Sequence, residues 1–141
     1  MNTSVKRAQV KWVDGLKFVG TDHGGHSIVM DTPVKSGGDD SAVAPGELVL
    51  VSLGGCTGVD VVSVLKRMRV PFRDVKIDIE AEPVETHPKI YKWIKIIYRL
   101  FGVADKSKAE KAVKLSQDKY CSVAAMLSKS AEVRYEINFE D

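Results

Sequence analysis

Apolar and polar residues alternate along several short stretches of the chain, and a period of two residues predicts β-strands. These stretches lie at residues 5–13, 16–20, 27–30, 75–81, 90–101 and 133–139. Asp14-Gly15 lies between the first two and predicts a hairpin turn. Both faces of the stretch at 90–101 are partly apolar, which indicates a strand that is covered on both sides.

The most apolar part of the chain predicts a helix from Pro45 to about Arg69. Proline suits the first position of a helix, and Glu47 in the first turn suits the positive end of the helix dipole. Pro71 cannot continue the helix. Residues 48–65 are apolar nearly all round, and this is typical of a helix that is buried on most of its sides.

Two shorter helices are expected before the last strand. Residues 105–117 place lysines opposite small apolar residues, and Asp118 can cap a further helix that ends near Lys129. A loop rich in glycine and aspartate, residues 31–44, precedes the central helix, and long loops are often functional or mobile. Antiparallel strands with segregated helices predict an α+β fold. We expect residues 1–141 to form a single domain.

Composition narrows the class of protein. A chain of 141 residues with 44% hydrophobic and 28% charged residues suits a soluble globular domain. The net charge of +2 gives no reason to expect a nucleic-acid partner. No secretory pattern is visible, and Ser52, glycines and Asp60 interrupt the most apolar stretch, so we expect a cytoplasmic protein with no membrane partner.

The two cysteines, Cys56 and Cys121, are the candidate chemical residues. Gly54, Gly55 and Gly58 surround Cys56, and each glycine inside a helix costs about 1 kcal/mol relative to alanine. The glycines therefore indicate that another helix or a substrate approaches closely. Cys121 would lie in the first turn of a capped helix, where backbone N–H groups stabilise a thiolate. Buried, inert cysteines are the open alternative for both positions.

Other candidate sites have weaker patterns. His23 and His26 lie near Asp22 and Asp31, but no cysteine or further histidine completes a metal-ligand set, so a turn is the better interpretation and no metal is expected. The lysine face of residues 105–117 is typical of a solvated surface.

Two segments carry a family resemblance. The segment from Ala44 through Gly55-Cys56 resembles the cysteine-bearing helix of the OsmC/organic hydroperoxide resistance family. Lys119-Tyr120-Cys121-Ser122 falls where that family has its second cysteine. The order of elements is also similar, so the resemblance covers nearly the whole chain. The Gly-Gly-Cys form looks most like a less characterised branch of the family.

The resemblance implies a thiol-dependent peroxidase without a cofactor. In this interpretation Cys56 attacks an organic hydroperoxide and becomes a sulfenic acid, and Cys121 condenses with it to a disulfide. An external dithiol then reduces the pair. The resemblance also implies an OsmC-like, intertwined homodimer around the long central helix, with active sites at the subunit interface. We therefore expect Cys56 and Cys121 to be spatial neighbours.

The sequence departs from the characterised peroxidases of this family at two positions. Those proteins have an arginine in the early hairpin, and the predicted turn here has none. They also have a glutamate directly after the proline, where this chain has Gly46. Glu47 lies about 180° from Cys56 around a helix, so as a catalytic residue it would have to come from the partner subunit. Asp60, one helical turn after Cys56, would disfavour a thiolate.

These departures leave other functions open. The first is a non-enzymatic redox sensor or thiol-mediated binding protein on the same fold. A structural dimer with inert cysteines is a third interpretation.

Overall fold

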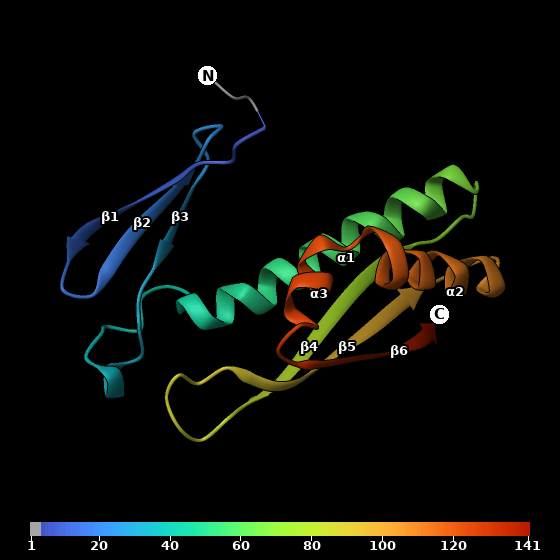
Figure 1. Ribbon diagram of the computed structural model, residues 1–141. Helices are drawn as coiled ribbons and strands as arrows, with labels where there is room; N and C mark the ends of the chain where they lie inside the picture. Colours follow the sequence, from blue (N-terminus) through green and yellow to red (C-terminus); the bar gives the residue numbers. More distant parts are fainter. Residues whose placement is uncertain (1–3) are drawn as a thin grey trace. The chain divides into compact units, whose positions relative to one another are not determined.

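The computed structural model describes residues 4–141, which form two compact units, one ending at Val49 and the other running from Leu50 to Asp141. The first unit holds an antiparallel sheet in the order β1-β2-β3 (Figure 1). Its strands are β1 (Ala8–Asp14), β2 (Lys17–Asp22) and β3 (Ser27–Met30). The turn expected before β2 is present, and Gly15 in it has a φ of 53°, which favours glycine. The first strands are therefore confirmed.

The loop after β3 is held by a single carboxylate. Asp31 is fully buried and accepts hydrogen bonds from the backbone N–H groups of Thr32, Asp39 and Ser41, at 2.7, 3.3 and 3.1 Å. The Ser41 hydroxyl donates a further bond of 2.6 Å. We call these four residues the loop cluster. A short 3-10 helix, η1 (Val34–Ser36), lies within the loop. The loop that the sequence indicated as functional or mobile is therefore built around an internal anchor.

The second unit contains a three-stranded sheet in the order β4-β5-β6. Its strands are β4 (Asp74–Pro83), β5 (Tyr91–Phe101) and β6 (Glu132–Glu140). β6 runs parallel to β5, which corrects the expectation of antiparallel strands throughout. A parallel pair needs a crossover connection, and here the connection consists of three short helical segments. These are α2 (Lys106–Leu115), the π-helical turn η2 (Ser116–Tyr120) and α3 (Ser122–Leu127).

Helices cover one face of this sheet only. Ile94, Ile96, Tyr98 and Leu100 of β5 are fully buried on the helical side, with α2, α3 and α1 (Pro45–Arg67) above them (Figure 1). The odd-numbered residues 91–101 are half-buried. The expectation that β5 is covered on both sides therefore holds fully for the helical face and only in part for the other face within this chain.

Cross-strand charge pairs shield the other face. Arg99 Nε donates to Glu140 Oε2 at 2.9 Å, and Lys95 pairs with Glu136. The Arg134 guanidinium lies 4.7 Å from the ring centroid of Trp93. Such pairs let a half-apolar strand face remain at the surface.

α1 buries one side within this chain. Its buried residues are Leu53, Thr57, Val61, Val64 and Leu65. Val51 and Val59, on other sides, are 61% and 69% exposed. The sequence predicted that α1 is buried on most of its sides. Within this chain only the side that packs against the sheet and the crossover segments is buried.

Gly54 and Gly58 of α1 let the strand β4 pack closely against the helix. A Cβ atom at Gly58 would lie 3.1 Å from Ile77 Cδ1, and one at Gly54 would lie 3.7 Å from Ile79 Cγ1. Both isoleucines belong to β4, so the close neighbour at these glycines is a strand within the same chain. A Cβ at Gly55 would meet nothing within 4 Å. The prediction of close helix contact is wrong for Gly54 and Gly58 in this chain.

The length and composition of α1 alone would also suit a membrane-spanning helix, contrary to the sequence-based expectation. The core helix of a soluble protein meets the same criteria. Here the buried side of α1 packs in the core of an α+β fold, and its Thr57 and Asp60 accept or donate hydrogen bonds there.

Candidate active site

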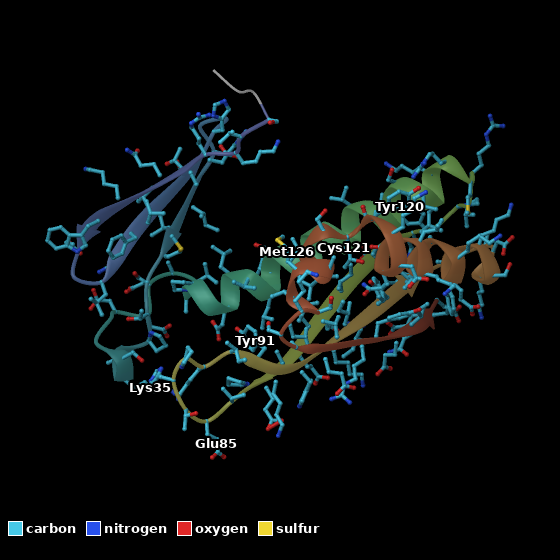
Figure 2. All side chains as sticks on the ribbon, in the orientation of Figure 1. Lys35, Glu85, Tyr91, Tyr120, Cys121 and Met126 are labelled. Carbon is cyan, nitrogen blue, oxygen red and sulfur yellow. The ribbon has the colours of Figure 1, made fainter. Side chains whose placement is uncertain are left out.

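Both cysteines are free thiols, but they differ in exposure. Cys56 lies on α1 and is half-buried against the core. Cys121 is only 3% exposed and lies at the start of α3 (Figure 2). Its Sγ accepts a 3.4 Å hydrogen bond from the Ala124 N–H, so Cys121 is itself the N-cap of α3. Asp118, which the sequence predicted as this cap, lies inside η2 instead.

The two thiols are neighbours. Besides burial, a side-chain hydrogen bond with Cys56 raises the pKa of Cys121, so the two thiols lie within hydrogen-bond reach of each other. The prediction that these cysteines meet is confirmed.

Burial is the largest influence on the pKa of Cys121. It raises the pKa of the Cys121 thiol to about 11, and the negative charge of Asp60 adds to this direction. The Ala124 N–H acts the other way and lowers the pKa. The expected stabilisation of a Cys121 thiolate by a backbone N–H group at the helix start is present, but desolvation outweighs it. At neutral pH, Cys121 is a protonated thiol.

A chain of hydrogen bonds joins the elements that carry the thiols. Its members are Gln117, Tyr98, Thr57, Ser116 and Asp60, and we call it the hydroxyl chain. Gln117 Nε2 lies 2.6 Å from Tyr98 Oη, which lies 2.6 Å from Thr57 Oγ1. Thr57 Oγ1 lies 2.7 Å from Ser116 Oγ, and Ser116 Oγ lies 2.8 Å from Asp60 Oδ2.

The hydroxyl chain has one direction. Ser116 donates its only hydroxyl proton to Asp60, so it accepts from Thr57. The Thr57 proton is then used, so Thr57 accepts from Tyr98. Burial raises the pKa of Tyr98 to about 12, so its proton stays available for that bond. Each of the three hydroxyls therefore donates one bond and accepts at least one.

Sequence reasoning missed most of the hydroxyl chain. Thr57, Tyr98 and Ser116 are fully buried polar residues in elements that otherwise bury apolar side chains. Asp60 was interpreted only as a charge near Cys56. It is in fact the last acceptor of the hydroxyl chain. The one available signal was that Thr57 and Asp60 interrupt an apolar helix beside a cysteine.

The remaining predicted site residues lie elsewhere. Glu47 is exposed in the first turn of α1. His26 Nδ1 lies 3.0 Å from Asp22 Oδ2, within the turn between β2 and β3. Within residues 4–141 no three histidine, cysteine or acidic side chains gather closely enough to hold a metal ion.

Known proteins share this architecture. A family model described as OsmC-like protein matches residues 38–136. The chain belongs to this family. It is 38% identical over 130 residues to protein YhfA of Escherichia coli (strain K12), covering 92% of this chain and 94% of YhfA.

Solved structures have the same fold as this chain. A hypothetical protein from Aquifex aeolicus VF5 has 36% identity and a TM-score of 0.80, covering 97% of this chain and 98% of that one. The organic hydroperoxide resistance protein OhrB of Bacillus subtilis has a TM-score of 0.66 over 95% of this chain and 98% of its own. Its identity is 15%, so this likeness concerns the fold alone. The α+β, OsmC-like fold is confirmed.

Proposed function

We propose that this OsmC-like protein is a thiol-dependent peroxidase that reduces organic hydroperoxides, with Cys56 as the peroxidatic and Cys121 as the resolving residue. The observation that carries the proposal is the unequal thiol pair. The more accessible Cys56 lies within hydrogen-bond reach of Cys121, which is 3% exposed and keeps its proton. An accessible thiol beside a shielded, protonated thiol suits a peroxidatic and a resolving cysteine, in that order.

The reaction balances without a cofactor. The Cys56 thiolate attacks the outer peroxide oxygen, the O–O bond breaks, and an alcohol leaves after taking up a proton. The Cys56 sulfenic acid then condenses with the Cys121 thiol, and the Cys121 proton leaves with the hydroxyl group as water. Because this proton is needed by the leaving group, a high pKa of Cys121 is compatible with resolution. An external dithiol supplies two electrons and two protons to restore both thiols.

The family supports a redox or peroxidase role in general. Two structural neighbours are named as organic hydroperoxide resistance proteins, from Legionella pneumophila and Bacillus subtilis. The apolar surroundings of Cys56 favour alkyl or lipid hydroperoxides over hydrogen peroxide. A cytoplasmic location, where thiols stay reduced, suits two free cysteines.

A homodimer forms part of the proposal. α1 exposes Val51, Gly55 and Val59, and β1 is exposed along its whole length, with Trp12 60% exposed. Apolar surface of this kind marks an interaction site, and we propose that a second copy of the chain covers it. Glu47 would then come from the partner subunit. Analytical ultracentrifugation at micromolar concentration should give twice the chain mass of 15.5 kDa. A stable, folded monomer would contradict the dimer.

A peroxide panel tests the enzymatic part. Organic hydroperoxides and hydrogen peroxide are supplied with a dithiol such as dihydrolipoamide, and turnover is measured for the wild type, Cys56→Ser and Cys121→Ser. Cys56→Ser should lose all turnover. Cys121→Ser is the matched control, since it should still consume about one peroxide per chain. Unchanged activity in Cys56→Ser would contradict the assignment of Cys56 as the peroxidatic residue.

A redox sensor is the second candidate. The negative charge of Asp60 favours the protonated form of Cys121, and slow resolution suits a sensor better than an enzyme. The same panel separates the two functions. Many turnovers per chain support the peroxidase, and a single stoichiometric oxidation supports the sensor.

A further inference from the structure

We propose that the hydroxyl chain is a positioning device for disulfide formation, which holds the segment carrying Cys121 against the helix carrying Cys56. Tyr98 and Thr57 are its central positioning residues. The role of the disulfide in turnover rests on the proposed function. The positioning itself concerns only whether the two thiols can join.

The hydroxyl chain spans three elements. Thr57 and Asp60 belong to α1, Tyr98 to β5, and Ser116 and Gln117 to η2. β5 is the central strand of its sheet, so Tyr98 is set in the most constrained part of the second unit. The hydroxyl chain therefore connects the crossover turn η2 both to the central helix α1 and to the strand β5.

A short covalent and hydrogen-bonded path links the two cysteines through this chain. Thr57 directly follows Cys56, and its hydroxyl contacts the Ser116 hydroxyl at 2.7 Å. The Ser116 carbonyl accepts the Cys121 N–H at 2.8 Å. Ser116 thus fixes the backbone of Cys121 with one group and contacts α1 with another.

The turn that carries Cys121 needs such support. η2 is π-helical, and its closing bond runs from Cys121 back to Ser116, five residues earlier. π-helical turns are rare and are found often at functional sites. Moving Ser116 would leave buried hydroxyls without hydrogen-bond partners, which is costly because these groups are also shielded from water. Each hydroxyl has one proton, and the donation from Ser116 to Asp60 fixes the direction of every other bond. The hydroxyl chain therefore has a single hydrogen-bonding pattern.

Disulfide formation is sensitive to this placement. The Cα atoms of a disulfide lie roughly 4.4–6.8 Å apart, and a displacement of about 1 Å at a reacting group can slow a reaction about 100-fold. The first reaction of Cys56 with an oxidant needs no second thiol to reach it. Loosening the hydroxyl chain should therefore slow closure of the disulfide and leave the first oxidation of Cys56 nearly unchanged.

Tyr98→Phe tests this inference, with Tyr135→Phe as the matched control. Tyr135 packs edge-on against Tyr98 at a centroid distance of 6.0 Å, and its hydroxyl takes no part in the hydroxyl chain. Closure is started with diamide, which accepts two electrons and two protons from the thiols to become the hydrazine, so no peroxide is needed. Intact-mass spectrometry of quenched samples gives the rate of disulfide formation.

Tyr98→Phe should slow closure about tenfold or more, and Tyr135→Phe should change it less than about twofold. In the Cys121→Ser background, an organic hydroperoxide replaces diamide, oxidises Cys56 to the sulfenic acid and is itself reduced to the alcohol; both variants should form this acid, trapped with dimedone, at the rate of their parent. Closure at the wild-type rate in folded Tyr98→Phe would overturn the inference. An equal slowing of both Cys56 oxidation and closure would also overturn it, since that result indicates general loosening.

A second pair covers the case in which Tyr98→Phe does not fold. Thr57→Val keeps the shape of the side chain without its hydroxyl, and Thr57→Ser keeps the hydroxyl. Slow closure only in Thr57→Val supports positioning, and equal rates overturn it. If the wild type turns over no peroxide while diamide closure still depends on Tyr98, the proposed function fails and the positioning role stands.

Discussion

Two carboxylates organise the two units of this chain, and they do so over different ranges of sequence. Asp31 accepts hydrogen bonds from Thr32, Asp39 and Ser41, none of which lies more than ten residues away. Asp60 accepts from Ser116, 56 residues later in the chain. The first carboxylate shapes one loop, whereas the second ends a chain of side chains from three elements.

The difference in range reflects a difference in bonding. Asp31 receives mostly backbone N–H groups, which any residue but proline offers, so the loop cluster depends on one side chain. The hydroxyl chain consists of side-chain groups throughout, and each member depends on the next. We expect the loop cluster to tolerate the loss of a peripheral member, and the hydroxyl chain to fail at any central one.

The largest expected effect is on the free energy of unfolding. We expect Thr57→Val to lower it more than Ser41→Ala does. Thr57→Val leaves the buried Tyr98 hydroxyl without an acceptor and should lower the free energy of unfolding by about 1–3 kcal/mol. Ser41→Ala removes one donor of Asp31, which keeps the three backbone bonds, and should cost less. Urea denaturation of each variant measures both values. A larger loss in Ser41→Ala would reverse the comparison.

Replacing the two aspartates by asparagine sharpens the contrast. Both oxygens of Asp31 accept hydrogen bonds, so Asp31→Asn turns an NH₂ group toward a backbone donor and should destabilise the first unit. Asp60 accepts through one oxygen, which asparagine retains, so Asp60→Asn should be mild in thermal unfolding. Equal losses of stability would contradict the assignment of the two roles.

Asp60→Asn should also change the chemistry of the thiol pair. The charged or titratable groups that interact with Cys121 are Cys56 and Asp60 from α1, which act on its pKa, and Tyr98 from β5, on whose pKa Cys121 acts. Removing the Asp60 charge should lower the pKa of Cys121, so the pH profile of diamide closure should move to lower pH. Asp31→Asn is the matched control and should leave that profile in place.

Alkaline pH should weaken the unit that holds the hydroxyl chain. Burial raises the pKa of Cys121 from 9.0 to about 11 and that of Tyr98 from 10.0 to about 12. The stability that these groups contribute is complete below the unfolded pKa values and is lost as pH rises through the folded ones. The urea midpoint should therefore fall between about pH 9 and 12. Tyr98→Phe and Cys121→Ala should each flatten the fall, and unchanged curves would argue against burial as the cause.

The smallest expected effect is at acid pH, in the loop cluster. Hydrogen bonds from Ser41 lower the pKa of Asp31 from 3.8 to about 2. A lowered carboxyl pKa stabilises the fold above the unfolded value, and this contribution is lost as pH falls through the folded value. Stability should drop between about pH 4 and 2 in the wild type. Asp31→Asn should remove this part of the acid response, and an unchanged drop would contradict it.

Secondary structure was largely predictable from the sequence. The period of two found the strands, and Pro45 and Pro71 bounded the central helix, because alternation and proline geometry act over a few residues. Errors arose where a segment depends on distant neighbours. Cys121 caps α3 in place of Asp118, since the preceding residues form a π-helical turn that is tied to α1.

The glycines of α1 show the same division. For Gly54 and Gly58 the helix cost correctly indicated a close approach, but it did not identify the neighbour. The register of β4 against β5 places Ile77 opposite Tyr98 and Ile79 opposite Ile96, and this sets which side of α1 meets the sheet. Sheet register is not encoded near the glycines themselves.

The sequence by itself determined the order of the elements and the α+β class, and it offered the two cysteines as candidate chemical residues, because local periodicity and residue type carry that information. The tertiary structure alone decided that a protonated, buried Cys121 lies beside Cys56, and that a one-way chain of hydroxyls ends at Asp60. Those properties depend on desolvation and on distances between residues far apart in sequence. Both arise only when the parallel pairing of β5 and β6 brings the crossover segment back across α1.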